Sequence, residues 1–179
     1  RLEPENNIET IIKGVLNSNT EQPLIIVGNH KIPHGKYLFN KYQNEKNIKF
    51  TGGIFKEDIL NNLRYFSNVY FHGHSAGGTN PSLLEAMACS ANICAHDNPY
   101  NRSVLNNKAV FFKNQQDIAY LMRSKEKIEE LKIISKDYPS MIQNNFFVED
   151  VINQYFVLFN DIIRSKNNNI VWSILDTYH

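Results

Sequence analysis

The chain has 179 residues, of which 42% are hydrophobic and 12% aromatic, and its 19 basic and 18 acidic side chains nearly cancel. This length fits one globular domain with a substantial core. The near-neutral balance argues against nucleic acid or an anionic membrane surface as a partner. The longest apolar runs fall far short of the ~20 residues that span a bilayer, so no transmembrane segment is expected.

Two cysteines, Cys89 and Cys94, lie in apolar stretches. Such thiols are more often buried and reduced than bridged, which favours a cytoplasmic location. The chain begins at Arg1 without an initiator methionine or a signal peptide, and RLEPENN is typical of a loop and a helix start with no strand before them. We therefore expect a fragment of a longer protein.

Short apolar runs alternate with segments of helical periodicity along the chain. This alternation predicts an α/β fold, with a parallel sheet covered by helices on both faces. The expected strands are Leu24–Val27, Ile48–Phe50, Val69–Phe71, Asn92–Ala95 and Val110–Phe112. The expected helices are Asn7–Leu16, Lys36–Glu45, Lys56–Phe66, Pro81–Ala88, Asn101–Leu105, Gln115–Met122, Lys125–Asp137 and Phe147–Arg164.

Two runs have continuous apolar stretches, LIIVG at residues 24–28 and NICAH at residues 92–96. Continuous apolar runs are typical of strands buried on both faces. Near the C-terminus, the polar stretch RSKNNNIV ends the last helix. We expect residues 1–164 to form the domain and residues 165–179 to form a tail that docks back on it through its apolar side chains.

Ligands of open parallel sheets bind beyond the carboxyl ends of the strands. The loop after Phe71 has the glycines and the helix start that such a site needs, and it can be interpreted in two ways. Gly73–Gly77 matches the G-x-S-x-G nucleophile elbow, which would make Ser75 the nucleophile of an α/β-hydrolase. The same loop is also typical of phosphate binding, because glycines and a helix N-terminus present free N–H groups.

The position of Pro81 weighs against the elbow. Proline is favoured at the first helical position, so the helix should begin at Pro81 with Thr79 or Asn80 as its N-cap, well after Ser75. After Ser75 the histidines are His96 and the final residue, His179. The hydrolase remains an alternative, as does a non-catalytic nucleotide-binding module.

The helix behind the loop carries one acidic side chain, Glu85. Leu84, Met87 and Ala88 are expected to form its apolar face, with Glu85 on a different face. A carboxylate there would repel phosphate, but it could accept hydrogen bonds from a pair of sugar hydroxyls. A solvated surface glutamate is the simpler alternative.

Other polar residues near the strand ends have structural interpretations. His72 and His74 lack a third ligand at a fitting spacing, so no metal site is expected, and His72 is interpreted as a packed sheet residue. Asp97 and Asn98 are expected to cap the next helix. Arg102 is expected to be surface structure.

The segment GGTNPSLLEAMA resembles the sugar-nucleotide loop and helix of retaining GT-B glycosyltransferases of family 4. RLEPENN, LIIVGNH and IKFTGGIF are similar to other segments of that family, in the same order and at similar spacing. The resemblance covers roughly residues 1–163. It corresponds to the C-terminal, Rossmann-like, donor-binding half of such enzymes, so that the N-terminal acceptor domain would be absent from this chain.

The resemblance implies a role for each matching residue. It implies that Glu85 binds the ribose and that Gly53 and Ile54 hold the nucleobase. The residues implied to contact the donor diphosphate and sugar are Arg1, His74, Gly77, Gly78, Thr79 and Asn80. Two positions depart from the family pattern: Gly77 stands where relatives have the first glutamate of E-x7-E, and Asn6 stands where they have a lysine.

The implied activity is transfer of a sugar from a nucleotide diphosphate sugar to a saccharide or lipid-linked saccharide acceptor, with retention and without a cofactor or metal. The segments EPENN and HSAGGTNPSLLEAMA resemble those of bacterial rhamnosyltransferases of cell-surface polysaccharides, of the O-antigen or capsule type. That likeness implies a donor such as dTDP-rhamnose and a cytoplasmic enzyme working at the inner face of the membrane. The fragment alone is expected to turn over little.

Overall fold

The computed structural model describes residues 2–146 and 148–166. The chain divides into two compact units between Pro139 and Ser140. All the described strands belong to the first unit, and the long helix α9 (Val148–Lys166) belongs to the second. From residue 167 onward, the predicted tail lies outside the described residues.

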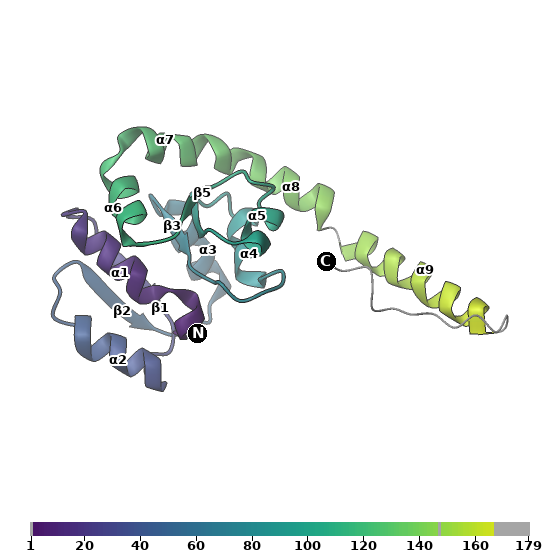
Figure 1. Cartoon of the computed structure of the whole chain (residues 1–179), viewed down its shortest axis with the longest axis horizontal. Helices are drawn as coiled ribbons and strands as arrows, with labels where there is room; N and C mark the ends of the chain where they lie inside the picture. Colours follow the sequence, from purple (N-terminus) through teal and green to yellow (C-terminus); the bar gives the residue numbers. More distant parts are fainter. Residues whose placement is uncertain (1, 147, 167–179) are drawn as a thin grey trace. The chain divides into compact units, whose positions relative to one another are not determined.

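Five short parallel strands occupy the first unit (Figure 1). The strands are β1 (Leu24–Val27), β2 (Ile48–Gly52), β3 (Tyr70–His72), β4 (Ile93–His96) and β5 (Val110–Phe112). They form two sheets, a β1–β2 pair and a three-stranded sheet in the order β3–β4–β5. The predicted parallel α/β architecture is confirmed, although no described strand joins β1 to β3.

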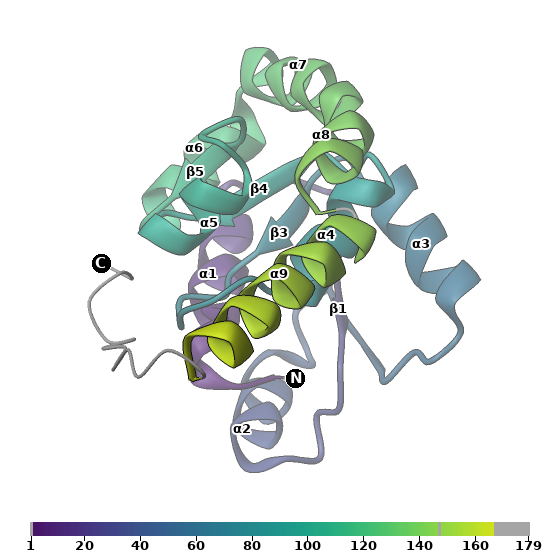
Figure 2. The same cartoon turned by 90° about the vertical axis from the view of Figure 1, so that its right-hand side faces the viewer.

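Helices follow the strands in alternation and flank the sheets (Figures 1 and 2). The helices of the first unit are α1 (Ile8–Asn17), α2 (Pro33–Tyr42), α3 (Glu57–Phe66), α4 (Pro81–Ala88), α5 (Pro99–Val104), α6 (Gln115–Arg123) and α7 (Lys125–Ile134), with 3-10 turns η1 (Pro4–Asn6) and η2 (Ser135–Asp137). No helix among the described residues is long and apolar enough to cross a membrane.

Proline explains where the predicted helix boundaries fail. Helix α2 begins at Pro33 rather than at Lys36, because proline occupies its first turn, where no N–H is needed. Helix α8 (Tyr138–Asn145) was not predicted at all. Pro139 was not recognised as part of a helix start, although proline is tolerated in a first turn.

The two apolar runs differ in how deeply they are buried. In β4, Ile93, Cys94 and Ala95 are all fully buried, as expected for a central strand, and burial raises the pKa of the Cys94 thiol. Both cysteines are free, with Cys89 half-buried. In β1 the expectation is wrong, since Ile25 is 44% exposed.

Helix α1 takes part in two hydrophobic core clusters of the first unit. Ile11 and Val15 pack in one core with residues of β4, β5 and α6, including Ile118. Ile12, one residue from Ile11, packs in the other core with Leu2 and residues of β1, β2 and α2. Helix α1 thus carries two adjacent apolar stripes, one with Ile11 and Val15 and the other with Ile12. Because each stripe packs in a different core, α1 links the two sheets.

The packing of α1 on α6 depends on a glycine (Figures 1 and 2). A Cβ atom at Gly14 would lie 2.5 Å from Ile118 Cβ and 2.9 Å from the Gln115 carbonyl oxygen. These atoms belong to the backbone or to the base of a side chain, and they cannot swing away. The absence of a side chain at Gly14 therefore sets how closely the two helices approach.

A polar cluster joins α1 to α2 on the outer side. The Glu9 carboxylate accepts hydrogen bonds from Lys41 Nζ at 2.8 Å, Tyr42 Oη at 2.9 Å and Tyr37 Oη at 3.1 Å. The Lys41 ammonium is the main cause that lowers the pKa of Glu9 to about 2, against an opposing effect of burial. The cluster fixes α2 relative to α1 while keeping the charges near solvent.

Replacing Gly14 by alanine should destabilise the protein by about 1–3 kcal/mol, because the added methyl overpacks the α1–α6 contact. Alanine is the better helix former by about 1 kcal/mol, so helix propensity alone predicts the opposite sign. Urea unfolding measures the change. Asn17→Ala, at an exposed position of the same helix, is the matched control. A Gly14→Ala variant as stable as the control would contradict the close-packing argument.

Candidate functional site

The turn that follows β3 is built against the N-terminal segment. A Cβ atom at Gly73 would lie only 2.0 Å from the Asn6 carbonyl oxygen and 3.1 Å from Ile11 Cδ1. Because the obstacle is backbone, no side chain can be accommodated there. The first glycine of the G-x-S-x-G pattern is therefore required by packing.

Hydrogen bonds fix the rest of this turn to the same segment. The backbone N–H and the hydroxyl of Ser75 both donate to the Glu5 carbonyl, each at 2.9 Å. Asn7 Nδ2 donates to the Gly73 carbonyl at 2.8 Å, and His74 Nδ1 lies 2.9 Å from Asn6 Oδ1. In the described part of the chain, the Ser75 hydroxyl thus bonds backbone and not a histidine, unlike the nucleophile of a catalytic triad.

A second layer of asparagines supports the turn from the side of α5. Asn98 Nδ2 and Asn101 Nδ2 donate to the His74 carbonyl at 3.1 and 3.0 Å. Asn101, which is buried, also donates to the His96 carbonyl at 2.9 Å. These contacts were not predicted, because side-chain amides within a polar helix start carry no distinctive spacing.

The predicted capping of α5 is half right. Asn98 is the N-cap and accepts from the Asn101 N–H at 2.9 Å. Asp97 instead pairs with Arg102, whose guanidinium lies 4.3 Å from the centre of the Phe111 ring. The guanidinium lowers the pKa of the Asp97 carboxyl. Arg102 is thus the structural residue that was expected.

Between Ser75 and α4, the loop is open to solvent. Ala76, Gly77, Gly78 and Thr79 are all exposed. Gly78 has φ +90°, a conformation that favours glycine, and the space where its side chain would stand is empty. At Gly77 a Cβ would approach the Tyr100 ring to 2.9 Å. The loop therefore exposes its backbone with little side-chain cover.

Helix α4 begins at Pro81, as predicted, and Asn80 rather than Thr79 is its N-cap. Asn80 Oδ1 accepts from the backbone N–H of Ser82 at 3.0 Å and from its hydroxyl at 2.7 Å. The cap uses one of the free N–H groups of the first turn. Pro81 has no N–H, and the N–H groups of Leu83 and Leu84 both donate to the Asn80 carbonyl, so the donors left for a ligand are those of the loop before the helix.

The buried stripe of α4 differs from the predicted one. Leu83, Ala86 and Met87 are buried, whereas Leu84 is half-buried and Ala88 is exposed. The sequence PSLLEAMA carries two overlapping stripes at helical spacing, and only tertiary packing selects between them. Met87 alone was placed correctly.

Glu85 lies on the exposed side of α4 and carries a partner that was not foreseen. Arg64, from α3, donates to Glu85 Oε2 and also to Asn61 Oδ1. The Arg64 side chain is only 10% exposed, while that of Glu85 is 56% exposed. The guanidinium therefore anchors one carboxylate oxygen from below and leaves the side chain accessible from solvent.

The turn predicted to hold a nucleobase follows β2. Gly52, with φ +76°, ends the strand, and its carbonyl accepts from the Gly28 N–H at 2.8 Å. Gly53 is exposed and Ile54 is half-buried, and the next side chain, Phe55, is 96% exposed. An aromatic ring so open at a strand end can stack on a planar ligand. No described contact joins this turn to the loop at Gly77.

His72 is the packed sheet residue that was expected, and it is 4% exposed. Its Nε2 is buried and has no hydrogen-bond partner in the described structure. Burial, with a smaller effect of the nearby His74, lowers the pKa of His72 to about 4. The described residues contain no cluster of three side chains able to hold a metal ion. Arg1 lies outside the described residues.

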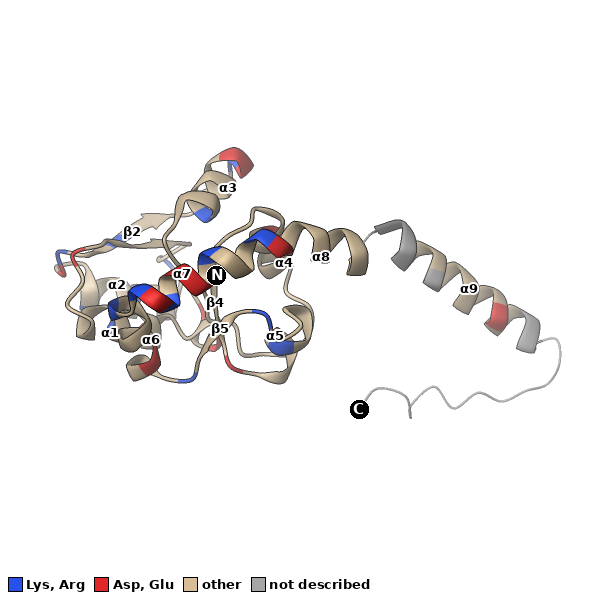
Figure 3. Ribbon diagram, turned by 90° about the horizontal axis from the view of Figure 1, so that it is seen from above, with Lys and Arg blue, Asp and Glu red and all other residues tan. Residues whose placement is uncertain are grey.

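Positive and negative side chains are interspersed over the first unit. The two signs alternate along α7, for example (Figure 3). This pattern agrees with the nearly balanced composition of the chain. The candidate site is therefore defined by backbone donors, glycines and Glu85 rather than by a basic patch.

In other proteins, a glycine-rich loop before a helix, at the carboxyl end of a parallel strand, is a typical arrangement for binding phosphorylated ligands. The family model described as "Glycosyl transferases group 1" matches residues 1–145. The chain belongs to this family. No curated protein matches the chain.

Solved structures of glycosyltransferases match the fold. Anabaena Alr3699/HepE in complex with UDP has a TM-score of 0.75 and 17% identity, over 90% of this chain and 47% of that one. Sucrose-phosphate synthase from Thermosynechococcus elongatus has a TM-score of 0.71 and 17% identity, over 92% of this chain and 44% of that one. The pneumococcal O-GlcNAc transferase GtfA, in complex with UDP and GlcNAc, has a TM-score of 0.68 and 16% identity, over 91% of this chain and 34% of that one.

These matches confirm the expected GT-B glycosyltransferase fold. The chain spans less than half of the length of the matched structures.

Acid should destabilise the protein through His72. The unfolded imidazole has the ordinary pKa of about 6.5 and the folded one about 4, so the unfolded state binds more protons between these values. Stability is then full above pH 6.5 and falls as the pH drops toward 4, with a loss of about 2 kcal/mol at pH 5. Urea unfolding between pH 7.5 and 5 measures it.

The variant His72→Leu should lose most of this pH dependence. A smaller part should remain, because burial also lowers the pKa of His96. His34→Leu, on α2, removes a histidine outside this site and should keep the wild-type slope. Identical slopes in all three proteins would show that His72 is not the responsible group.

Ser75→Ala should not change the hydrolysis of p-nitrophenyl acetate, because the Ser75 hydroxyl donates to the Glu5 carbonyl rather than to a histidine or carboxylate of the described residues. The lost hydrogen bond should cost about 0.5–1.5 kcal/mol of stability. Ser103→Ala, at an exposed position of α5, is the control. Ester hydrolysis that requires Ser75 but not Ser103 would restore the nucleophile interpretation.

Proposed function

We propose that this chain is the donor-binding domain of a glycosyltransferase that transfers a sugar from a nucleotide diphosphate sugar to a saccharide acceptor. One observation carries the proposal. The exposed backbone of Gly77, Gly78 and Thr79 is held between a rigid turn at Gly73–Ser75 and the Asn80 cap, with the accessible Glu85 carboxylate one turn into α4. Family membership supports the same reaction class.

The loop would bind the diphosphate. Its backbone N–H groups and the N-terminal end of the α4 dipole favour anionic oxygens. During transfer, the bond from the anomeric carbon to the diphosphate oxygen breaks and a bond to the acceptor hydroxyl forms. Negative charge then grows on the departing diphosphate, and donors fixed in advance stabilise it. In this proposal Arg1 and His74 would add to the same end of the ligand.

Glu85 would hold the ribose. The Glu85 carboxylate is anchored at Oε2 by Arg64 and can still accept hydrogen bonds from two vicinal hydroxyls. The nucleobase would lie on the turn at Gly53 and Ile54, where the exposed Phe55 ring offers a stacking surface. The turn at Gly53 follows β2 and the loop at Gly77 follows β3, and these strands belong to separate sheets. In this proposal the ends of both sheets therefore contact the same nucleotide.

We also propose the stereochemistry, the acceptor and the location of the whole enzyme. Transfer would proceed with retention and without a metal or cofactor, onto a saccharide or lipid-linked saccharide of a cell-surface polysaccharide. The acceptor would be bound by a second domain, in the cytoplasm at the inner face of the membrane. The non-catalytic nucleotide-binding module remains the alternative, and it predicts the same ligand without transfer.

The donor base and sugar can be narrowed by chemistry. Two of the three solved structures described above contain UDP, while the likeness to rhamnosyltransferases suggests a dTDP-sugar. Uracil and thymine share the same hydrogen-bonding edge, but only UDP carries a 2′-hydroxyl. If Glu85 binds both ribose hydroxyls, it should favour UDP over dUDP and dTDP.

Glu85→Gln should weaken UDP binding by roughly 1–3 kcal/mol, because a charge-assisted pair of hydrogen bonds is lost. The loss for dUDP should be smaller, since one hydroxyl is missing. Calorimetric titration of both nucleotides measures this. Glutamine keeps an acceptor for Arg64, and a thermal melt checks that the fold persists.

Glu126→Gln, at an exposed position of α7, removes the same charge from another helix and serves as the matched control. Equal UDP affinities for wild type, Glu85→Gln and Glu126→Gln would rule out the ribose role. Equal losses for UDP and dUDP would assign Glu85 to the 3′-hydroxyl alone.

A further inference from the structure

The phenol end of Tyr100 lies against the glycine-rich loop. A Cβ atom at Gly77 would lie 2.9 Å from Tyr100 Cζ, 3.1 Å from Oη and 3.2 Å from Cε1. These three atoms form the tip of the side chain, so the hydroxyl end of the ring meets the loop. Tyr100 is 50% exposed, and a ligand bound on the loop can therefore reach it.

Gly77 differs from Gly78 in what its missing side chain allows. Gly78 has φ +90°, whereas the φ of Gly77 is not positive, so the backbone conformation of Gly77 does not call for glycine. A side chain at Gly77 would instead meet the Tyr100 ring. This is also the position where relatives have the first glutamate of E-x7-E. The tip of Tyr100 occupies the space that such a side chain would need.

Helix α5 is held against the turn that precedes the loop, and Tyr100 is its second residue. Asn98 and Asn101, on either side of Tyr100 in the sequence, both donate to the His74 carbonyl, at 3.1 and 3.0 Å. These bonds fix the backbone of Tyr100 relative to the turn. Its ring therefore starts from a rigid base and ends over the loop.

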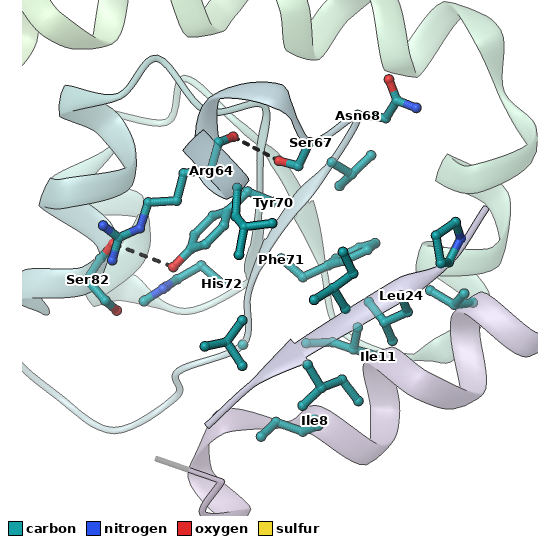
Figure 4. A pocket seen from close by; sticks show the side chains of 18 of the residues that line it. Ile8, Ile11, Leu24, Arg64, Ser67, Asn68, Tyr70, Phe71, His72 and Ser82 are labelled. Atoms are coloured by element: carbon teal, nitrogen blue, oxygen red, sulfur yellow. Dashed lines mark hydrogen bonds between the residues drawn. The ribbon is translucent and has the colours of Figure 1, made fainter. Parts of the chain in front are cut away.

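The hydroxyl of Tyr100 is not used by the fold, in contrast to that of Tyr70. A cavity of about 840 Å³ lies between β1 and β3, and Tyr70 and Ser82 both line it (Figure 4). The Tyr70 hydroxyl donates to the Ser82 carbonyl at 3.5 Å. Tyr100 does not line this cavity, and no described residue forms a hydrogen bond with its hydroxyl. The Tyr100 hydroxyl is therefore available to a ligand.

We propose that Tyr100 contacts the sugar carried by the donor, with its hydroxyl hydrogen-bonded to a hydroxyl group of that sugar. This inference rests on the proposed donor site, in which the ribose lies at Glu85 and the diphosphate lies on the loop. The sugar is joined to the terminal phosphate, so it lies at the end of the donor away from the ribose. Tyr100 meets the loop at Gly77, before the chain enters the helix that carries Glu85.

The chemistry of a phenol suits a sugar better than a phosphate. A phenol hydroxyl both donates and accepts hydrogen bonds, and so does a sugar hydroxyl, whereas an ionised phosphate oxygen only accepts. The loop already offers backbone donors to the phosphates. A site that hydrogen-bonds a substrate hydroxyl strongly disfavours analogues that lack it. Tyr100 thus contributes to the choice of the transferred sugar.

Tyr100→Phe tests the contact, because it keeps the ring against Gly77 and removes only the hydroxyl. Calorimetric titration compares UDP-glucose with UDP, and dTDP-rhamnose with dTDP. For at least one of the two donors, the affinity relative to its own nucleotide should fall about three- to tenfold, as expected for one lost hydrogen bond. Tyr120→Phe makes the same change on α6, at a residue that is 59% exposed, and should keep the wild-type ratio.

A second variant acts on the same contact from the loop. The methyl group of Gly77→Ala would meet the far end of the Tyr100 side chain, which can move aside. The displaced hydroxyl should then lose the sugar, and the relative affinity for the donor should fall by a similar factor. In the double variant Gly77→Ala/Tyr100→Phe the two losses should not add, because both remove the same hydrogen bond. A thermal melt of each variant checks the fold.

The outcomes separate this inference from the proposed function. A wild-type protein that binds neither nucleotide would overturn the proposed function and the inference with it. Nucleotide binding by the wild type, with the same donor-to-nucleotide ratios in Tyr100→Phe, would overturn the inference and leave the donor site standing. Equal losses for a donor and for its nucleotide would also overturn it, because the hydroxyl would then contact the diphosphate.

Discussion

The backbone contact between Gly73 and Asn6 is the constraint on which the site depends. It brings the start of the chain against the turn after β3, at a distance that only glycine allows. The same short segment continues into α1, which packs in two hydrophobic core clusters. The turn that bears His74 and Ser75 is therefore positioned by the helix that joins the two sheets, and its geometry follows from packing rather than from catalysis at Ser75.

That constraint leaves the chemistry to the loop that follows. The turn is bonded to Glu5, Asn6 and Asn7 on one side and to asparagines of α5 on the other. Beyond it, the chain between Ser75 and Asn80 is exposed. This loop is held at both ends and open to solvent between them. Such an arrangement suits backbone N–H donors, which must be in place before charge develops on a ligand. Glu85, anchored by Arg64, extends the same rigid frame onto α4.

Local signals in the sequence were sufficient to place the helix at Pro81, the strands and the parallel α/β class, because proline, glycine and apolar runs act within a few residues. They could not show Arg64 beneath Glu85 or Asn101 beneath His74, since each contact joins residues more than twenty positions apart. The prediction of which α4 residues are buried was wrong for a related reason. Leu84 and Leu83 offer equivalent helical spacing, and only the surrounding fold selects Leu83.

The most informative wrong prediction is that β1 is buried on both faces. A run as apolar as LIIV indicates a strand with neighbours on both sides and cover on both faces, yet Ile25 is 44% exposed. β4, which has two neighbouring strands, matches its own pattern fully. β1 and β3 each lack one neighbour, and their free edges face the same cavity. The sequence of β1 is thus suited to an interior position in a sheet, whereas in the described structure β1 has one neighbouring strand.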